Sequence, residues 1–528
     1  MKDQSPATSK GESIRARYAT TIVVQFFQLL ASVVTAGVVP RALGPAVYGS
    51  YNFLLGMAST VRATLTLGTQ QTFFTKSSQT KDSGSLTKLY ALFLVGQWIF
   101  IMGFIFAIHV LGLQVWVWPN QYLNQIVIVT SLEWLIFVAL TLEQLGDTKK
   151  LTIYTQILTG IGSFLNAGGL LILALLHRLN FYSYTFWMLF VTVLISTGLS
   201  VYLLGIHRDV CWTGTLFGQT RKHIQDWRRY ASPLIVYSAA SALLTGLDIY
   251  LIQCFYGPQE QGYFALASRW ASLSLTFTGA ALSIYWREIA SSLAARDRER
   301  AREIYLRFSH LLFFLTLVLS CWLCLGARHL VQSIAGMEYL PAAPLLMIMA
   351  FYPVQQTFGQ LCGAAFLASE RTREYRNYGI LFAGLGAVVT YFLLAPRSAA
   401  VPGLGLGARG VALKMVVLGM LTVQFYELSN ARFFQFSYLQ ATIDKMKTTL
   451  VVGGIAFVIL RGLIRQMGIP AGRVGIIPLG LISVFYFLVV GLVAFFCPVL
   501  AGLRAQDIDS AVADLKTNMA SIRLRRRQ

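Results

Sequence analysis

The chain has 528 residues, of which 56% are hydrophobic and only 12% are charged. Ordinary soluble domains carry about 25% charged residues, so this composition excludes a typical soluble domain and indicates a polytopic membrane protein. A net charge of +21 would favour nucleic acid as a partner of a soluble protein, but the basic residues here fall between long apolar runs. We therefore attribute the charge to membrane orientation and expect no nucleic-acid partner.

The expected fold class is an all-α polytopic membrane protein with fourteen transmembrane helices. Each apolar run below is long enough to cross about 30 Å of hydrocarbon, which takes roughly 20 helical residues. The first run is longer than the apolar core of a secretory signal, so we expect an uncleaved span. The runs cover residues 18–40, 47–74, 88–113, 121–145, 151–176, 181–206, 231–256, 262–286, 305–327, 341–368, 375–396, 404–427, 448–467 and 475–500.

The distribution of Lys and Arg predicts the orientation. With both termini in the cytoplasm, basic residues on the cytoplasmic side outnumber those outside by about four to one. The cytoplasmic segment 207–230 mixes aromatic and basic residues, as an interfacial helix does. The basic tail 504–528 has apolar residues at helical spacing, which predicts an amphipathic helix on anionic membrane lipids. A solvated tail that only fixes the orientation is the alternative.

A repeat organises the chain. Gly44-Pro45-x-x-x-Gly49 and Gly257-Pro258-x-x-x-Gly262 share their spacing, and each motif joins the first two spans of a six-span block. The later cytoplasmic turns LGDTKK and ASERTREY are also alike. Both blocks start inside, so we expect two parallel six-helix lobes with binding sites between them near the midplane. The predicted parts are an N-lobe (1–206), a linker (207–230), a C-lobe (231–430), spans 13 and 14 (431–503) and the tail (504–528).

The order of motifs carries a family resemblance over roughly residues 14–430. It rests on Arg41-Ala-Leu-Gly-Pro-x-x-Tyr-Gly-x-Tyr, Leu247-Asp248, Tyr256-Gly-Pro-x-x-x-Gly-Tyr-x-x-Ala265 with Arg269, and Gly336-x-Glu-Tyr-x-x-Ala-Ala-Pro-Leu-Leu346. This set resembles the polysaccharide-translocase (O-antigen flippase) family of the multidrug/oligosaccharidyl-lipid/polysaccharide exporter superfamily. The resemblance implies two six-helix lobes plus a terminal helix pair. It also implies translocation of an undecaprenyl-diphosphate-linked oligosaccharide across the plasma (inner) membrane, with other polysaccharide-assembly proteins as candidate partners.

Charged residues inside spans are the candidate site, because a charge in hydrocarbon is costly unless it faces a cavity or a partner. Asp248 and Arg269 fall at one depth in adjacent antiparallel spans, so they form either a structural salt bridge or part of the substrate or ion site. Arg62 and Glu133 fall near mid-bilayer. A guanidinium offers a forked donor to phosphate, so Arg62 is the main candidate for the diphosphate, with pairing to Glu133 as the alternative.

Two further roles complete the predicted cavity. Lys414 in span 12 is a second candidate for binding the anionic head group. Glu133 is a candidate coupling carboxylate, with proton and sodium both left open as the coupling ion. Together these residues predict a cavity of net positive charge, which lowers the cost of moving a dianionic head group through the membrane.

The remaining motifs predict no enzyme chemistry, cofactor or metal. Gly405-Leu-Gly407-Ala-Arg-Gly410 matches the dinucleotide fingerprint but follows no strand, so small-residue helix packing is the better interpretation. Cys321 and Cys324 lie within an apolar span without further metal ligands. Two alternatives to a flippase stay open. One is a cation-coupled drug or metabolite exporter of the same superfamily, and the other is a membrane glycan polymerase or ligase.

Overall fold

The computed structural model describes residues 14–66, 84–207, 220–462 and 476–502, with a few single residues or pairs at 69–70, 73–74, 77 and 212. Two compact units divide the chain, Met1–Ala265 and Leu266–Gln528. The described residues are almost entirely helical. The predicted helix in the tail 504–528 and most of the predicted linker before residue 220 lie outside the described residues.

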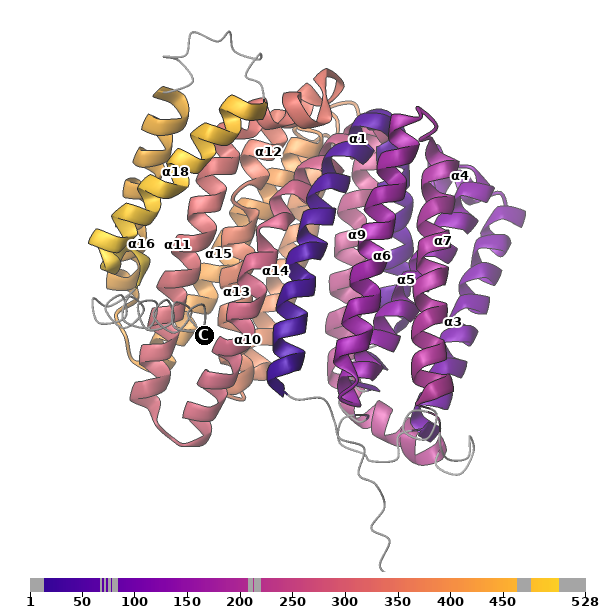
Figure 1. The fold of residues 1–528 in the computed structure, drawn as a ribbon, viewed down its shortest axis with the longest axis horizontal. Helices are drawn as coiled ribbons and strands as arrows, with labels where there is room; N and C mark the ends of the chain where they lie inside the picture. Colours follow the sequence, from indigo (N-terminus) through magenta and orange to yellow (C-terminus); the bar gives the residue numbers. More distant parts are fainter. Residues whose placement is uncertain are drawn as a thin grey trace, which may run out of the picture. The chain divides into compact units, whose positions relative to one another are not determined.

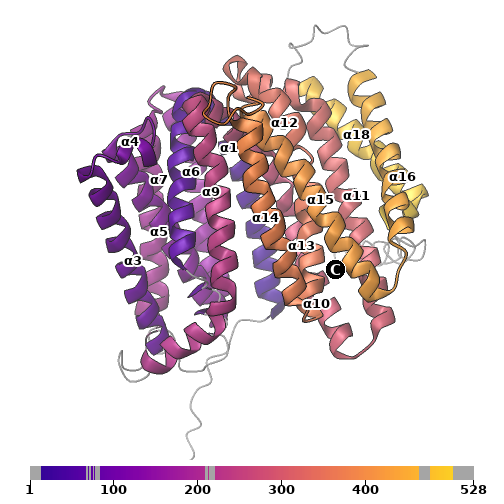
Figure 2. The same cartoon turned by 180° about the vertical axis from the view of Figure 1, so that it is seen from behind.

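The first unit consists of helices that run side by side (Figures 1 and 2). Helix α1 packs against α5 and α6, and α7 packs against α5, α6 and α1. Helix α9 begins in this unit and ends in the second one. The helices are α1 (Ile14–Thr66), α3 (Gly84–Val110), α4 (Gln114–Val117), α5 (Leu123–Thr148), α6 (Thr152–Leu175), α7 (Phe181–Ser200) with the π-helical turn η1 (Val201–Ile206), and α9 (Thr220–Leu273).

The second unit is built in the same way. Helix α11 packs against α10, α13 and α16, and α15 packs against α13 and α14. Its helices are α10 (Leu275–Ala294), α11 (Arg298–Leu330), η2 (Val331–Ala335), η3 (Met337–Ala342), α12 (Ala343–Met349), α13 (Tyr352–Ala368), α14 (Thr372–Leu394), α15 (Ala408–Phe434), α16 (Tyr438–Ala456), η4 (Phe457–Gly462), α18 (Ile476–Phe496) and η5 (Pro498–Ala501).

The two Gly-Pro motifs break the two longest helices, as the sequence predicts. Gly44 in α1 has φ 75° and ψ 165°, and Gly257 in α9 has φ 79° and ψ −173°. Only glycine adopts these angles without strain, and the proline that follows has the fixed φ of a first helical turn. Each motif therefore ends one helix and starts the next in almost the same conformation.

The turns LGDTKK and ASERTREY, which the sequence places on the cytoplasmic side, are also alike in structure. Lys150 has φ 61° and Glu370 has φ 60°. In each turn the amide of the next residue donates a hydrogen bond to the carbonyl oxygen five residues earlier. Leu151 donates to Gly146 at 2.9 Å, and Arg371 donates to Phe366 at 2.9 Å. Equivalent turns thus follow α5 and α13, at corresponding places of the predicted repeat.

Among the described residues, two predicted spans are interrupted in their interior. Span 262–286 is divided at Ser274. The amide of Ser274 donates a hydrogen bond to the carbonyl oxygen of Ala271, three residues earlier, where an α-helix would use the residue four earlier. Span 341–368 consists of α12 and α13, separated at Ala350 and Phe351. Pro353 explains the second break, because proline donates no backbone hydrogen bond and its ring clashes with the carbonyl of the preceding turn.

The apolar side chains divide between the core and the outer faces of the helices. In the first unit a buried cluster forms around Phe73, Tyr90 and Phe137, and in the second around Tyr285, Tyr305 and Phe366. Many large apolar side chains remain exposed on α3, α6 and α18, which suits contact with lipid tails. Among the described residues, ten helical stretches are long and apolar enough to cross a membrane. The two parts of α1 before and after Gly44 count as one of these stretches.

Candidate functional site

Arg62 and Glu133 meet inside the first unit. Arg62 Nε donates a hydrogen bond of 2.7 Å to Glu133 Oε1, which joins α1 to α5. The guanidinium lies over the ring of Phe137, 4.1 Å from its centroid. Side-chain exposure is only 17% for Arg62 and 10% for Glu133. The structure therefore contains the ion pair that the sequence offered as the alternative role of Arg62.

This pairing uses only part of the donor capacity of Arg62. Among the described residues, the guanidinium hydrogen-bonds through Nε alone, so both Nη groups keep their N–H donors. The adjacent Gln97 donates to the carbonyl oxygen of Arg62 at 3.3 Å, while its own buried Oε1 accepts no hydrogen bond from the residues that the structure describes. Glu133 thus orients the guanidinium and leaves the two terminal nitrogens for another acceptor. A phosphate takes such a fork through two oxygens.

The other three predicted site residues have different settings. Asp248 is buried, with 8% exposure, and lies in the first unit on α9. Arg269 is exposed and Lys414 is half-buried on α15, and both belong to the second unit. The salt bridge between Asp248 and Arg269 and the phosphate role of Lys414 stay predictions.

The structure contains a further ion pair that the sequence does not predict, and this one is buried. Lys445 on α16 hydrogen-bonds Glu427 on α15, with side-chain exposures of 8% and 1%. The ammonium also lies over the ring of Phe358, 4.1 Å from its centroid. The predicted spans 404–427 and 448–467 leave Lys445 in the connection between them. Its helix periodicity is the missed signal, because it shares one buried face with Ala441, Thr448, Val452 and Ala456.

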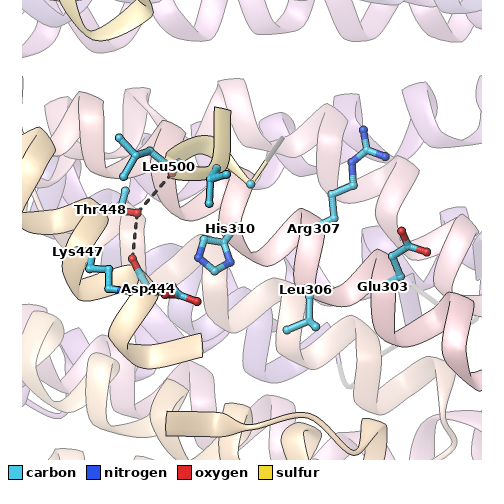
Figure 3. A pocket seen from close by; sticks show the side chains of 10 residues that line it. Glu303, Leu306, Arg307, His310, Asp444, Lys447, Thr448 and Leu500 are labelled. Carbon is cyan, nitrogen blue, oxygen red and sulfur yellow. Dashed lines mark hydrogen bonds and ion pairs between the residues drawn. The ribbon is translucent and has the colours of Figure 1, made fainter. Parts of the chain in front are cut away.

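Two cavities adjoin α16 in the second unit. The larger, of about 400 Å³, lies between α11, α16 and η5 (Figure 3). Its charged lining residues carry both signs, and Asp444 pairs with Lys447 at 3.2 Å, so it lacks the cationic excess of an anion site. The smaller, of about 160 Å³, is lined in part by Glu427 and Lys445.

Comparison with known proteins identifies the class. The family model described as "Polysaccharide biosynthesis protein" matches residues 38–344, more than half of the chain. The chain therefore belongs to this family, and its helices make it a multi-pass membrane protein. No match was found among curated protein sequences.

Solved structures share the fold across most of the chain. A structure described as the lipid II flippase MurJ in an inward closed conformation is 13% identical, with a TM-score of 0.65, and covers 92% of this chain and 100% of its own. An inward-facing multidrug resistance MATE family transporter of the MOP superfamily is 15% identical, with a TM-score of 0.61 and coverages of 80% and 98%. A MOP superfamily transporter from Pyrococcus furiosus is 14% identical, with a TM-score of 0.57 and coverages of 81% and 98%.

Proposed function

We propose that the chain is a flippase that moves a polyprenyl-diphosphate-linked oligosaccharide across the plasma membrane. In this proposal fourteen helices form two six-helix lobes and a terminal pair, and the lobes expose a cationic cavity to each side of the membrane in turn. It is a transporter and not an enzyme. Support comes from membership of the polysaccharide biosynthesis family and from the fold shared with a lipid II flippase.

The observation that best supports a diphosphate-linked substrate is the partial pairing of the Arg62 guanidinium. A half-buried guanidinium that Glu133 holds at Nε, with both Nη groups bonded to none of the described residues, fits an anionic head group that arrives and leaves. An arginine without a carboxylate partner would be costly to bury while the cavity is empty. An arginine with all its donors paired would offer phosphate nothing. The partial pairing meets both requirements.

The proposed roles of the other charges follow from their sign. Arg269 and Lys414 add positive charge that attracts the diphosphate. Asp248 offsets part of this charge, so that the substrate is not bound too tightly to be released. Glu133 is the proposed coupling carboxylate, since a proton or sodium ion on it would change its hold on Arg62. A dependence of transport on either ion gradient would identify the coupling ion.

Purified protein in vesicles with labelled lipid-linked oligosaccharide in one leaflet tests the function. We expect the label to appear in the other leaflet at unchanged length. A lengthened oligosaccharide in the original leaflet would indicate a polymerase. Transport of a soluble amphiphilic drug, with the lipid-linked substrate left in place, would indicate an exporter.

A further inference from the structure

The two Gly-Pro turns touch each other through reciprocal contacts of their backbones. A Cβ atom built on Gly49 would lie 1.8 Å from the carbonyl oxygen of Pro258, and one built on Gly262 would lie 2.0 Å from that of Pro45. Pro45 and Gly49 begin the helix after the first turn, and Pro258 and Gly262 begin the helix after the second. The glycine that follows each turn thus packs directly against the proline carbonyl oxygen of the other turn. Both contacts lie within the unit Met1–Ala265.

This contact needs glycine because of proximity and not because of backbone angles. Positive φ occurs at Gly44 and Gly257, whereas Gly49 and Gly262 lie within helices and have negative φ. A methyl group at either position would overlap a carbonyl oxygen of the backbone, which cannot rotate away as a side chain can. Small residues allow two helix backbones to approach in this way.

Neighbouring contacts keep the same helices in place. Ile249 fills the space beside Gly56, and Thr60 that beside Gly246, so α1 after its turn packs on α9 before its turn. Nearer the turns, the Tyr250 hydroxyl donates a hydrogen bond of 2.5 Å to the carbonyl oxygen of Trp116. Gln253 donates to that of Pro119 at 3.2 Å. These groups lie toward the turns, on the predicted outer side of the membrane.

We infer that Gly49 and Gly262 are positioning residues, which hold the two turns together in one transport state and release them in the other. The inference rests on the proposed function, because lobes that rock must separate at one end. A Cα–H···O contact contributes only about 0.5–1 kcal/mol. The reciprocal pair therefore selects one geometry without preventing its separation in each cycle.

Thiol labelling tests this inference without requiring substrate. Gln261 is 2% exposed beside Gly262, so Gln261→Cys, in a chain whose native cysteines are replaced by alanine, reports on opening of the contact. We expect Gly49→Ala to raise labelling by a membrane-impermeant reagent at least about tenfold, and translocation to fall, because the methyl group excludes the closed state. Gly103→Ala is the matched control, since a Cβ there meets no atom of the described residues within 4 Å.

A double substitution separates a shared contact from two local defects. Because the two glycines form one contact, the thiol at position 261 should react no faster in the double variant, Gly49→Ala with Gly262→Ala, than in Gly49→Ala alone. Unchanged labelling in Gly49→Ala would overturn the inference, even with translocation lost. So would failure of both single variants to reach the membrane while Gly103→Ala does. Raised labelling in Gly49→Ala, with a parent chain that translocates no lipid-linked substrate, would contradict the proposed function and leave the contact standing.

Discussion

Each unit of the molecule has a cation over a phenylalanine ring, and the two sites differ in what holds the cation. In the first unit Arg62 lies over Phe137, and in the second Lys445 lies over Phe358, both at 4.1 Å. The two rings occupy related places, since Phe137 lies 13 residues before the left-handed residue Lys150 and Phe358 lies 12 before Glu370. The rings are thus one residue apart in the register of the repeat.

The partners of the rings come from different parts of the chain. Arg62 belongs to the second predicted span and pairs with a carboxylate on the helix that carries the ring. Lys445 belongs to α16, the first helix of the predicted terminal pair, and pairs with α15. The second unit therefore uses this place to attach the terminal pair. In the first unit the terminal nitrogens of the cation bond to none of the residues that the structure describes. Similar ion pairs thus attach a helix in the second unit and, under the proposed function, orient a binding group in the first.

The largest expected difference between the pairs is in transport. Removing a desolvated charge contact costs about 2–5 kcal/mol, so Arg62→Ala should lower translocation at least about thirtyfold, and Arg62→Lys should retain part of it. Because Arg62→Ala also leaves Glu133 unpaired, Arg62→Ala with Glu133→Gln serves as the stability-matched variant. Arg178→Ala, at an exposed arginine, is the control for charge. Full translocation by Arg62→Ala would exclude the diphosphate role.

The second pair should instead dominate stability. Lys445→Met leaves Glu427 buried without its cation, which costs about 3–5 kcal/mol, and the thermal midpoint in detergent should fall accordingly. Replacing both partners, Lys445→Met with Glu427→Gln, removes the unpaired charge and should recover most of the loss. Translocation per folded molecule should change far less than in Arg62→Ala. A stable Lys445→Met protein with lost transport would reverse the assigned roles.

The sequence predicted the parts of this comparison that depend on local chemistry. Gly44-Pro45 and Gly257-Pro258 break their helices because glycine and proline restrict the backbone directly. The positions of Arg62 and Glu133 along their spans also predict that both lie near mid-bilayer.

What the sequence could not supply depends on tertiary packing. The ring of Phe358 and the carboxylate of Glu427 reach Lys445 from two other helices, so its burial follows from how α13, α15 and α16 meet. The reciprocal approach of Gly49 and Gly262 likewise needs two turns that are 213 residues apart to touch. Spacing showed that the motifs match each other, but not that they are in contact.

Substitution of the rings gives an intermediate effect. A cation–π contact contributes between about 0.5 and 2 kcal/mol, depending on how far it is desolvated, and about 1.4 kcal/mol corresponds to tenfold. Phe137→Leu should therefore lower translocation about tenfold by loosening Arg62, with a small change in thermal midpoint. Phe358→Leu should mainly lower the thermal midpoint. Equal effects of the two substitutions on both measurements would show that the rings only fill space.

The smallest expected effect concerns the predicted pair of Asp248 and Arg269, one on each side of the boundary between the units. Asp248 is buried and Arg269 is exposed, so solvent weakens any attraction and a coupling of about 0.5–1 kcal/mol is expected. Asp248→Arg with Arg269→Asp should then translocate a few times faster than either single variant, as measured in the same vesicles. Asp248→Asn with Arg269→Gln is the uncharged control. If the exchanged pair is no faster than the single variants, the two residues act separately, and Arg269 is left to serve the head group alone.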